Sequence, residues 1–190
     1  MLKEIVARNR SYRRFYQDYS IEMDTLRELV DLARMSPTGA NLQSLKYILS
    51  CDTEKNAKIF PTLAWAGYLK DWPGPEEGER PSAYIVMLGD TSISKSFGCD
   101  HGIAAQSIML GAVEKGLGGC MIGSLRRRDL IHALNIGEQY EILLVLALGK
   151  PKEVVQIEDI GPDGSVRYWR DENKVHHLPK RKLEDIILDN

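Results

Sequence analysis

Cysteine is scarce in this 190-residue chain, and its three positions share no motif. Cys51, Cys99 and Cys120 are odd in number, lie far apart and include no C-x-x-C pair. Disulfide frameworks need paired cysteines and structural zinc sites need closely spaced ones, so the distribution argues against both. It suits a reducing compartment, and we expect a cytoplasmic protein that holds no metal.

Long hydrophobic runs and a strong net charge are also missing. No stretch approaches the ~20 apolar residues that cross a membrane, and the first ten residues lack the apolar segment of a signal peptide. The formal net charge of -2 creates no field that would draw the chain to polyanions. We therefore expect neither a membrane nor a nucleic acid among its partners.

The chain also lacks internal repeats and low-complexity segments. With 43% hydrophobic and 27% charged residues it has the composition of an ordinary globular protein, without the bias of a disordered one. A length of 190 residues usually forms one domain with a substantial core. We expect a single domain over residues 1–190.

Hydrophobic periodicity predicts a mixture of helices and strands. Helices are expected over 2–8, from an N-cap at Asp24 to a stop before Pro37, over 52–60 and over 99–116, where Gly116 would end the helix. Strands are expected over 46–51, 83–89, 141–149 and 165–169. The strand at 141–149 is apolar on both faces and is therefore predicted to be central. The segment 71–81, rich in Pro, Gly and acidic residues, is predicted to be a mobile flap.

Basic residues are concentrated in the stretch "ARNRSYRRFYQDYS", residues 7–20, which holds Arg8, Arg10, Arg13 and Arg14. A basic arm for nucleic acid, a solvated surface and a pocket for one small anion would all produce such a cluster. The overall charge counts against the nucleic-acid arm. The choice between the other two depends on the rest of the chain.

Two clusters of small residues carry candidate binding groups. In "KGLGGCMIGSL", residues 115–125, glycines permit close backbone approach to a ligand and leave N–H groups free to meet it. In "SPTGANLQ", residues 36–43, the amides of Asn41 and Gln43 can both donate and accept. Each cluster by itself also fits an ordinary turn. Neither has the spacing of a phosphate loop or a dinucleotide fingerprint, so no preference between NADH and NADPH is predicted.

Four segments occur in the order seen in the nitroreductase family of flavin enzymes, which the chain resembles along nearly its whole length. They are "RNRSYRRF", "SPTGANLQ", "GIAAQSIMLGAVEKGLGGCMIGS" and "LPKRKLEDI". The resemblance implies an α+β fold, a central mostly antiparallel sheet surrounded by helices, in a homodimer. It further implies an FMN-dependent oxidoreductase that takes hydride from NADH or NADPH and reduces a nitroaromatic, quinone or related electron-poor acceptor.

The resemblance also implies the cofactor-binding residues. Those expected at the FMN phosphate or the polar edge of the flavin are Arg10, Ser11, Arg13, Lys180 and Lys182. Those expected against the flavin, partly across the dimer interface, are Pro37, Thr38, Gly39, Asn41 and Gln43. Those expected at one flavin face are Met121, Ile122, Gly123 and Ser124, with the Gly123 N–H donating to the hydride-accepting nitrogen. No side chain is expected to be catalytic, because the flavin carries the redox chemistry.

Several other residues are expected to lie on the surface or in the core without a role in binding. Arg14 lies beyond the family pattern and is expected to be solvated, and His176 and His177 are expected on the surface. Cys120 is expected to be an inert buried thiol, and Trp65 to pack in the core. The tail 179–190 is expected to pack on the flavin site or on the partner subunit.

Two alternatives to this function stay open at the sequence level. One is a flavoprotein of the same fold with another redox task, such as dehalogenation or a biosynthetic oxidation. The other is a non-enzymatic module that binds nucleic acid or phosphate through the arginine stretch.

Overall fold

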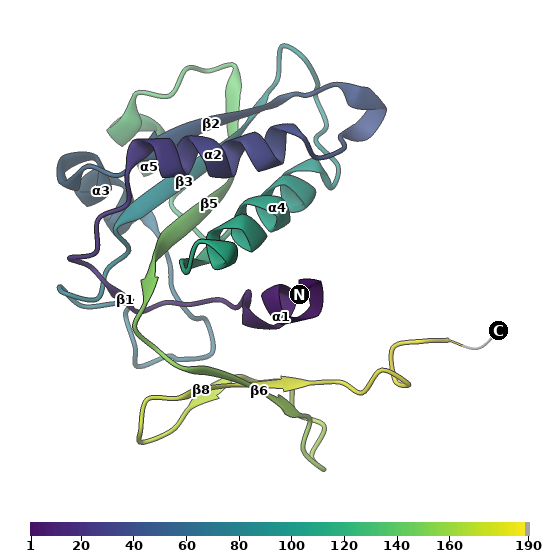
Figure 1. Ribbon diagram of the computed structural model, residues 1–190. Helices are drawn as coiled ribbons and strands as arrows, with labels where there is room; N and C mark the ends of the chain where they lie inside the picture. The colour runs from purple at the N-terminus through teal and green to yellow at the C-terminus, as the bar shows by residue number, and fades with distance from the viewer. Residues whose placement is uncertain (189–190) are drawn as a thin grey trace.

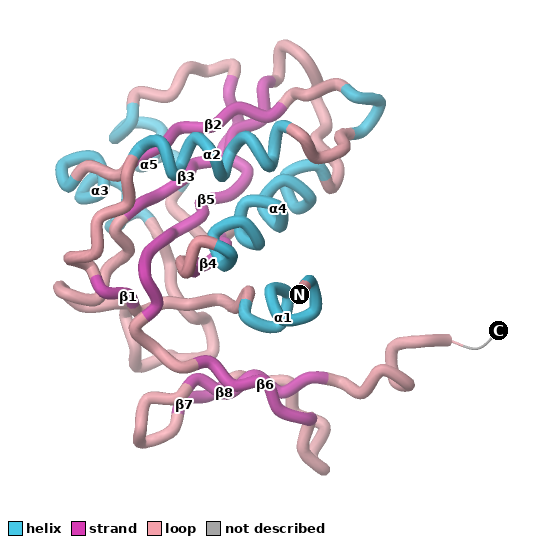
Figure 2. The backbone as a smooth tube through the Cα atoms, in the orientation of Figure 1, coloured by secondary structure: helices cyan, strands magenta, loops and turns pink. Residues whose placement is uncertain are grey.

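The computed structural model of the protein describes residues 1–188. Within this range no helix is long and apolar enough to cross a membrane. Five strands form an antiparallel sheet in the order β1-β5-β3-β2, and β4 also pairs with β5 (Figures 1 and 2). Their bounds are Phe15–Tyr16 for β1, Leu45–Ser50 for β2, Ala83–Asp90 for β3, Gly118–Ile122 for β4 and Tyr140–Pro151 for β5.

The two middle strands, β3 and β5, are covered on both faces of the sheet. All eight residues of β3 are buried, as the continuous apolar run predicts. Ile85 and Met87 of this strand face one hydrophobic cluster, and Val86 with its even-numbered neighbours faces the other. The predicted central position of 141–149 is confirmed, because β5 pairs with β1, β3 and β4.

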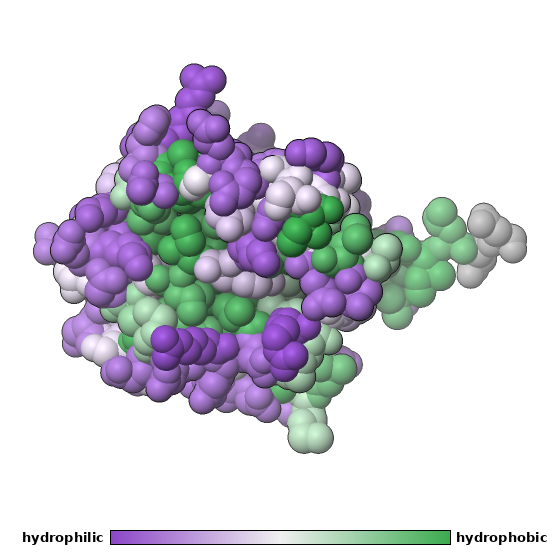
Figure 3. All heavy atoms as spheres, turned by 90° about the horizontal axis from the view of Figure 1, so that it is seen from above, coloured by the Kyte–Doolittle hydropathy of each residue, from purple (hydrophilic) through white to green (hydrophobic). Residues whose placement is uncertain are grey.

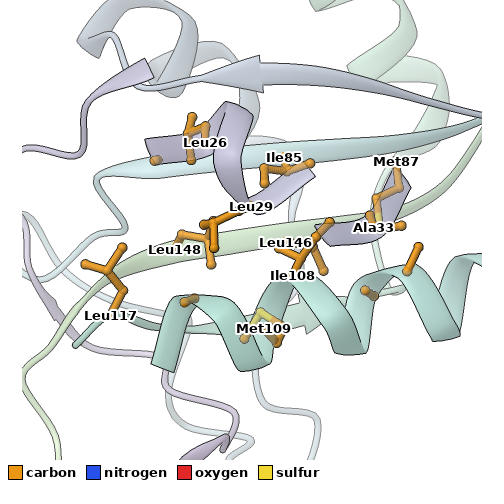
Figure 4. Packing of buried hydrophobic residues seen from close by; sticks show 14 of the residues in the cluster. Leu26, Leu29, Ala33, Ile85, Met87, Ile108, Met109, Leu117, Leu146 and Leu148 are labelled. Atoms are coloured by element: carbon orange, nitrogen blue, oxygen red, sulfur yellow. The ribbon is translucent and has the colours of Figure 1, made fainter. Parts of the chain in front are cut away.

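Helices supply the two covers. One face packs against α2 (Met23–Arg34) and α4 (Asp100–Glu114), and the residues labelled in Figure 4 interlock there. The other face packs against α3 (Thr53–Ile59) and α5 (Arg127–Leu134) through Ile59 and Leu130. The short helix α1 (Leu2–Arg8) lies beside α4, and two single turns are η1 (Gly39–Asn41) and η2 (Phe60–Thr62).

Helix ends follow local chemistry at most positions. The Asp52 carboxylate accepts from the Lys55 N–H at 2.7 Å and caps α3, as its position predicts. At the end of α4, Gly116 adopts φ +73°, which lets the Leu117 N–H reach the Ala112 carbonyl at 2.8 Å. The predicted N-cap at Asp24 is wrong: α2 begins at Met23, its N-cap is Glu22, and Asp24 lies in the first turn.

A second, three-stranded sheet lies below the main body in Figure 1. In it β8 (His176–Lys180) pairs parallel with β6 (Val155–Asp159) and antiparallel with β7 (Trp169–Arg170). The strand predicted at 165–169 is wrong except for its last residue. Its polar residues before Trp169 form a loop, because the partner of this segment is only the start of β8.

The tail beyond β8 is exposed in the single chain. Leu183, Ile186, Ile187 and Leu188 each expose at least 54% of their surface. Figure 3 shows this apolar segment extending from the body toward the grey terminal residues. Within residues 1–188, nothing therefore covers the hydrophobic side chains of the segment 183–188.

Arg14 is buried, which corrects the expectation of a solvated side chain. Its guanidinium donates through Nε and Nη2 to both carboxylate oxygens of Glu79, and Lys152 Nζ lies 3.1 Å from the same carboxylate. The hydrogen bond from Arg14 is the main reason that the pKa of Glu79 falls from 4.5 to about 2. This ion pair anchors the segment 71–81 to β1 at Glu79, so that part of the predicted flap is fixed.

We predict that Glu79→Gln destabilises the protein by about 3–5 kcal/mol at pH 7, because it leaves the buried Arg14 without its anion. The folded-state pKa of Glu79 lies below 4.5. The carboxylate therefore stabilises the fold fully above pH 4.5, and this contribution is lost as the pH falls toward 2. The difference between variant and wild type in urea unfolding should shrink across that window.

Glu54→Gln is the matched control, because its ion pair with Lys58 lies on the surface of α3. Glu54→Gln should leave the unfolding midpoint unchanged both at pH 7 and in the window from pH 4.5 toward 2. Equal midpoints for Glu79→Gln and the wild type at pH 7 would show that the buried pair does not stabilise the fold.

Candidate functional site

Two adjoining cavities lie where residues 9–13 meet β4. Cavity A, about 310 Å³, is lined by Asn9, Arg10, Ser11, Arg13, Gln106, Met109, Gly119, Met121, Tyr168, Leu178 and Lys180. Cavity B, about 260 Å³, is lined by Arg13, Ala64, Trp65, Ala66, Gly67, Cys120, Met121, Ile122, Gly123, Ser124 and Tyr168. Arg13, Met121 and Tyr168 line both cavities and form the wall between them.

A close approach between two backbones brings the arginine stretch to this place. Ser11 forms a parallel bridge with Gly119, and the Tyr12 N–H donates to the Gly119 carbonyl at 2.9 Å. A Cβ at Gly119 would lie 2.3 Å from the Ala147 carbonyl oxygen, so glycine is required there. Glycine at position 119 therefore allows the close packing of the strands. As a result, residues 10–13 run alongside β4.

Arg10 has donor capacity to spare. Its Nη2 donates to the Val6 carbonyl at 2.6 Å, whereas its Nε is buried without a hydrogen-bond partner among residues 1–188. An unsatisfied buried donor costs stability unless a ligand meets it. Asn9 donates to Gln106 at 3.3 Å, and both residues line cavity A.

The guanidinium of Arg13 contacts neutral groups, whereas its backbone N–H donates to the Glu153 carboxylate. Its Nη1 lies 3.2 Å from the Ser11 carbonyl and 3.3 Å from His176 Nε2, and its guanidinium lies 5.1 Å from the centre of the Tyr168 ring. Arginine can only donate, so Nε2 of His176 must accept. Burial, reinforced by Arg13 and Arg170, lowers the pKa of His176 to about 4 and keeps the ring neutral.

The four clustered arginines therefore differ in their electrostatic surroundings. Arg8 is exposed and Arg14 is neutralised by Glu79. Within residues 1–188, Arg10 and Arg13 form no ion pair with a carboxylate, and both line cavity A. The stretch is therefore not a uniformly exposed basic arm, and its two uncompensated charges point to a small anion.

Strand β4 sends alternate side chains to opposite sides. Met121 is 36% exposed and lies between the cavities, whereas Ile122 is 4% exposed and packs in the cluster beneath α3 and α5. The Ile122 side chain therefore points into the core, because successive strand residues point to opposite sides, although the residue also lines cavity B. Its position at a flavin face stays a prediction.

Gly123 directly follows β4, which ends at Ile122, and lines cavity B. The Gly119 carbonyl points to Tyr12 and away from β5. Continuing the strand alternation by four residues predicts that the Gly123 N–H also points away from β5. No acceptor for this N–H is found in the described part of the chain. A Cβ at Gly123 would have nothing nearer than Leu144 at 4.0 Å, so the chain's own packing does not require glycine here.

The segment 36–43 does not reach either cavity within one chain. Thr38 and Gln43 line a separate hollow beside Tyr47, and the Gly39 N–H donates to Asp100 at 3.0 Å. Ala40, Asn41 and Gln43 have positive φ angles of 50°, 54° and 51°. Such backbone costs ~1–3 kcal/mol for a residue other than glycine and is characteristic of functional segments. Pro37 belongs to the same segment and lines no part of cavities A and B.

The two lysines of the tail are placed differently. Lys180, at the end of β8, lines cavity A together with Leu178. Lys182 is exposed and lines neither cavity. The structure thus brings together the following predicted residues: Arg10, Ser11, Arg13, Met121, Ile122, Gly123, Ser124 and Lys180.

Sequence reasoning missed Tyr168 and His176. Tyr168 lines both cavities from a loop for which a strand is predicted, and His176 is fully buried beside Arg13 instead of lying on the surface. No local pattern signals these two residues, since both reach the site through the long connections of the second sheet. Trp65 packs against the core as expected and also lines cavity B, where its buried Nε1 has no partner in the described part of the chain. Cys120 is buried, and burial raises the pKa of its thiol, which agrees with an inert role.

Relatives of known sequence support one family. The family model described as "Nitroreductase family" matches residues 6–150. YodC of Bacillus subtilis, a candidate NAD(P)H nitroreductase, is 24% identical, with 87% of this chain and 97% of that protein covered. A candidate NADH dehydrogenase/NAD(P)H nitroreductase of Methanothermobacter thermautotrophicus is 26% identical, with 79% of this chain and 77% of that protein covered.

Solved structures have the same fold. A nitroreductase family protein from Clostridium novyi NT superposes with a TM-score of 0.65 at 19% identity, covering 94% of each chain. A candidate nitroreductase from Exiguobacterium sibiricum, solved with FMN, superposes with a TM-score of 0.66 at 18% identity, covering 80% of this chain and 89% of that one. The predicted α+β nitroreductase fold is thereby confirmed. With three quarters of its length matched by the family model, this chain belongs to the nitroreductase family.

Proposed function

We propose that the protein is an FMN-dependent oxidoreductase that takes hydride from NADH or NADPH and reduces a nitroaromatic, quinone or related electron-poor acceptor. The family assignment confirms the oxidoreductase class, the NAD(P)H dependence and the cofactor FMN. One observation on this chain supports the proposal. Arg10 and Arg13, which have no carboxylate partner, and the backbone of Gly123, whose N–H has no acceptor in the described part of the chain, line adjoining cavities.

The residues of cavity A fit a phosphate group. Arg10 has a buried Nε without a partner, and Arg13 holds its charge against neutral acceptors only. Lys180 adds a third cation at the end of β8, and Ser11 adds a hydroxyl. Forked arginine donors combined with a lysine are a strong arrangement for a phosphate dianion. We assign phosphate binding to Arg10, Ser11 and Lys180.

The residues of cavity B fit a flat ring. FMN supplies the hydride-transfer chemistry when bound. Met121 offers an exposed apolar side chain, and Gly123 offers an N–H for the hydride-accepting nitrogen. Arg13, on the wall between the cavities, places positive charge where negative charge develops during reduction, which stabilises it electrostatically. Ser124 lies beside Gly123 on the same wall.

A second copy of the chain accounts for the residues left outside the cavities. We propose a cytoplasmic homodimer in which Pro37, Thr38, Gly39, Asn41 and Gln43 complete the partner's flavin site. Two observations support the dimer: the exposed apolar segment 183–188, and a groove of about 340 Å³ between α1, α2 and α4. That groove is lined by Leu2, Ile5, Leu32, Met35 and Leu110, among others. We place Lys182 with the tail near the phosphate once the tail has docked.

Arg10→Ala should weaken FMN binding about ten- to hundredfold, because a charge-assisted hydrogen bond to phosphate is worth ~1.5–3 kcal/mol. Flavin affinity is measured by fluorescence quenching on apoprotein refilled with FMN. Arg8→Ala is the control from the same stretch, since its side chain is exposed and lines neither cavity. An unchanged affinity in Arg10→Ala would remove this residue from the phosphate site.

Gly123→Pro should lower turnover about a hundred- to a thousandfold, because it deletes the N–H assigned to the hydride-accepting nitrogen. Gly123→Ala keeps the N–H and has room for its Cβ within the chain. Turnover with an artificial acceptor is compared between the two variants at equal flavin content and melting temperature.

Cys120→Ser tests the same assignment from the other side and should keep most of the activity. A folded, yellow Cys120→Ser protein without activity would mean that a thiol carries chemistry assigned here to the cofactor.

For the Gly123 variants, equal losses of turnover in Gly123→Ala and Gly123→Pro would mean that the space at this position, and not the N–H, matters.

Light scattering should show a dimer at micromolar concentration, and removal of residues 181–190 should raise its dissociation constant. The reason is that the tail buries four large apolar side chains only if another surface covers them. A flavin-loaded monomer of the full chain would contradict the dimeric site.

A further inference from the structure

A third cavity, cavity C, lies apart from the site described above. It has a volume of about 230 Å³ and is enclosed by residues 17–20, by the chain from Cys51 through α3, and by residues 77–84. It shares no lining residue with cavity A or cavity B. Cavity C is therefore a separate pocket from cavities A and B, although Phe60 on its wall lies 6.0 Å, centre to centre, from the Trp65 ring of cavity B.

Two polar atoms on the walls of cavity C are buried without partners in the described part of the chain. They are Nε of Arg80 and Oγ of Ser82. The neighbouring Asn56 bonds elsewhere: its amide donates to the Ser82 carbonyl at 2.8 Å and accepts from the Ser50 hydroxyl at 2.7 Å. Two unsatisfied donors on one small cavity are the pattern expected where a ligand supplies the acceptor.

Arg80 is also fixed in position before any ligand arrives. Its backbone N–H donates to Gln17 Oε1 at 3.2 Å, and its guanidinium lies 4.5 Å from the centre of the Phe60 ring. The preceding residue, Glu79, is anchored by Arg14. Within residues 1–188 Arg80 has no carboxylate partner, so a cation that is already held in place lines cavity C.

We propose that cavity C binds a small monocarboxylate, which accepts hydrogen bonds from the Arg80 guanidinium and the Ser82 hydroxyl. The planar fork of arginine matches the geometry of a carboxylate. The small volume limits the ligand to a short organic acid. Glu77 also lines the cavity, and its negative charge disfavours dianions such as phosphate or a dicarboxylate.

The experiment is an NMR titration of the full-length, FMN-loaded protein with acetate. Saturable shifts are expected at the backbone amides of Arg80 and Ser82 and at the Asn56 side-chain amide. Arg80→Gln should weaken acetate binding about tenfold or more. Arg27→Gln is the control, because that arginine pairs with Asp24 on the exposed side of α2 and should leave acetate binding unchanged.

Ser82→Ala separates a binding role from a structural one. It removes a buried hydroxyl that has no partner, so the melting temperature should stay the same or rise while acetate binding weakens. A lowered melting temperature with unchanged acetate affinity would overturn the proposal, because the hydroxyl would then serve the fold.

Inorganic phosphate and succinate are titrated in parallel to test the ligand class. Weaker binding of both than of acetate at these residues supports a monocarboxylate site. Tighter binding of phosphate or succinate, or the absence of saturable shifts with acetate, would overturn it.

Discussion

The rest of the structure depends on the burial of β3 and β5 on both faces. A strand covered on both sides must be apolar at every position, and it must find helices for each face. Here α2 and α4 cover one face and α3 and α5 the other. β5 also pairs with β4 and β1, so the residues that flank these edge strands are positioned by the core itself. Cavities A and B lie at that edge.

The arginine stretch shows how tertiary structure divides one charge cluster into different roles. The Arg14 guanidinium faces the buried Glu79 and is neutralised. The guanidinium of Arg13, the preceding residue, instead contacts a carbonyl, a neutral imidazole and an aromatic ring, while its backbone N–H donates to Glu153. Because no carboxylate compensates it, the positive charge of the Arg13 guanidinium is available to attract an anionic ligand. The buried His176 contributes by accepting a hydrogen bond from Arg13 without adding a negative charge.

The second sheet completes the site from a distance in sequence. β8 brings His176 and Lys180 to the walls beside residues 10–13, and the loop before β7 brings Tyr168. The parallel pairing of β8 with β6 fixes the position of the residues just before the tail. The segment that follows Lys180 on the wall of cavity A is the exposed segment 183–188. Because the two are continuous, the dimer and the flavin site are proposed together.

The sequence by itself determined the elements with strong local signals: the apolar run of β3, the Asp52 cap of α3, the Gly116 end of α4 and the central position of β5. Its ordered motifs also indicated the family and the cluster around Arg10, Ser11 and Gly123. Only the tertiary structure decided that Arg14 is an internal ion-pair partner, that Ile122 faces the core, and that His176 and Tyr168 support Arg13. These depend on side chains and strands far apart in the chain meeting at one place, and no local propensity encodes such meetings.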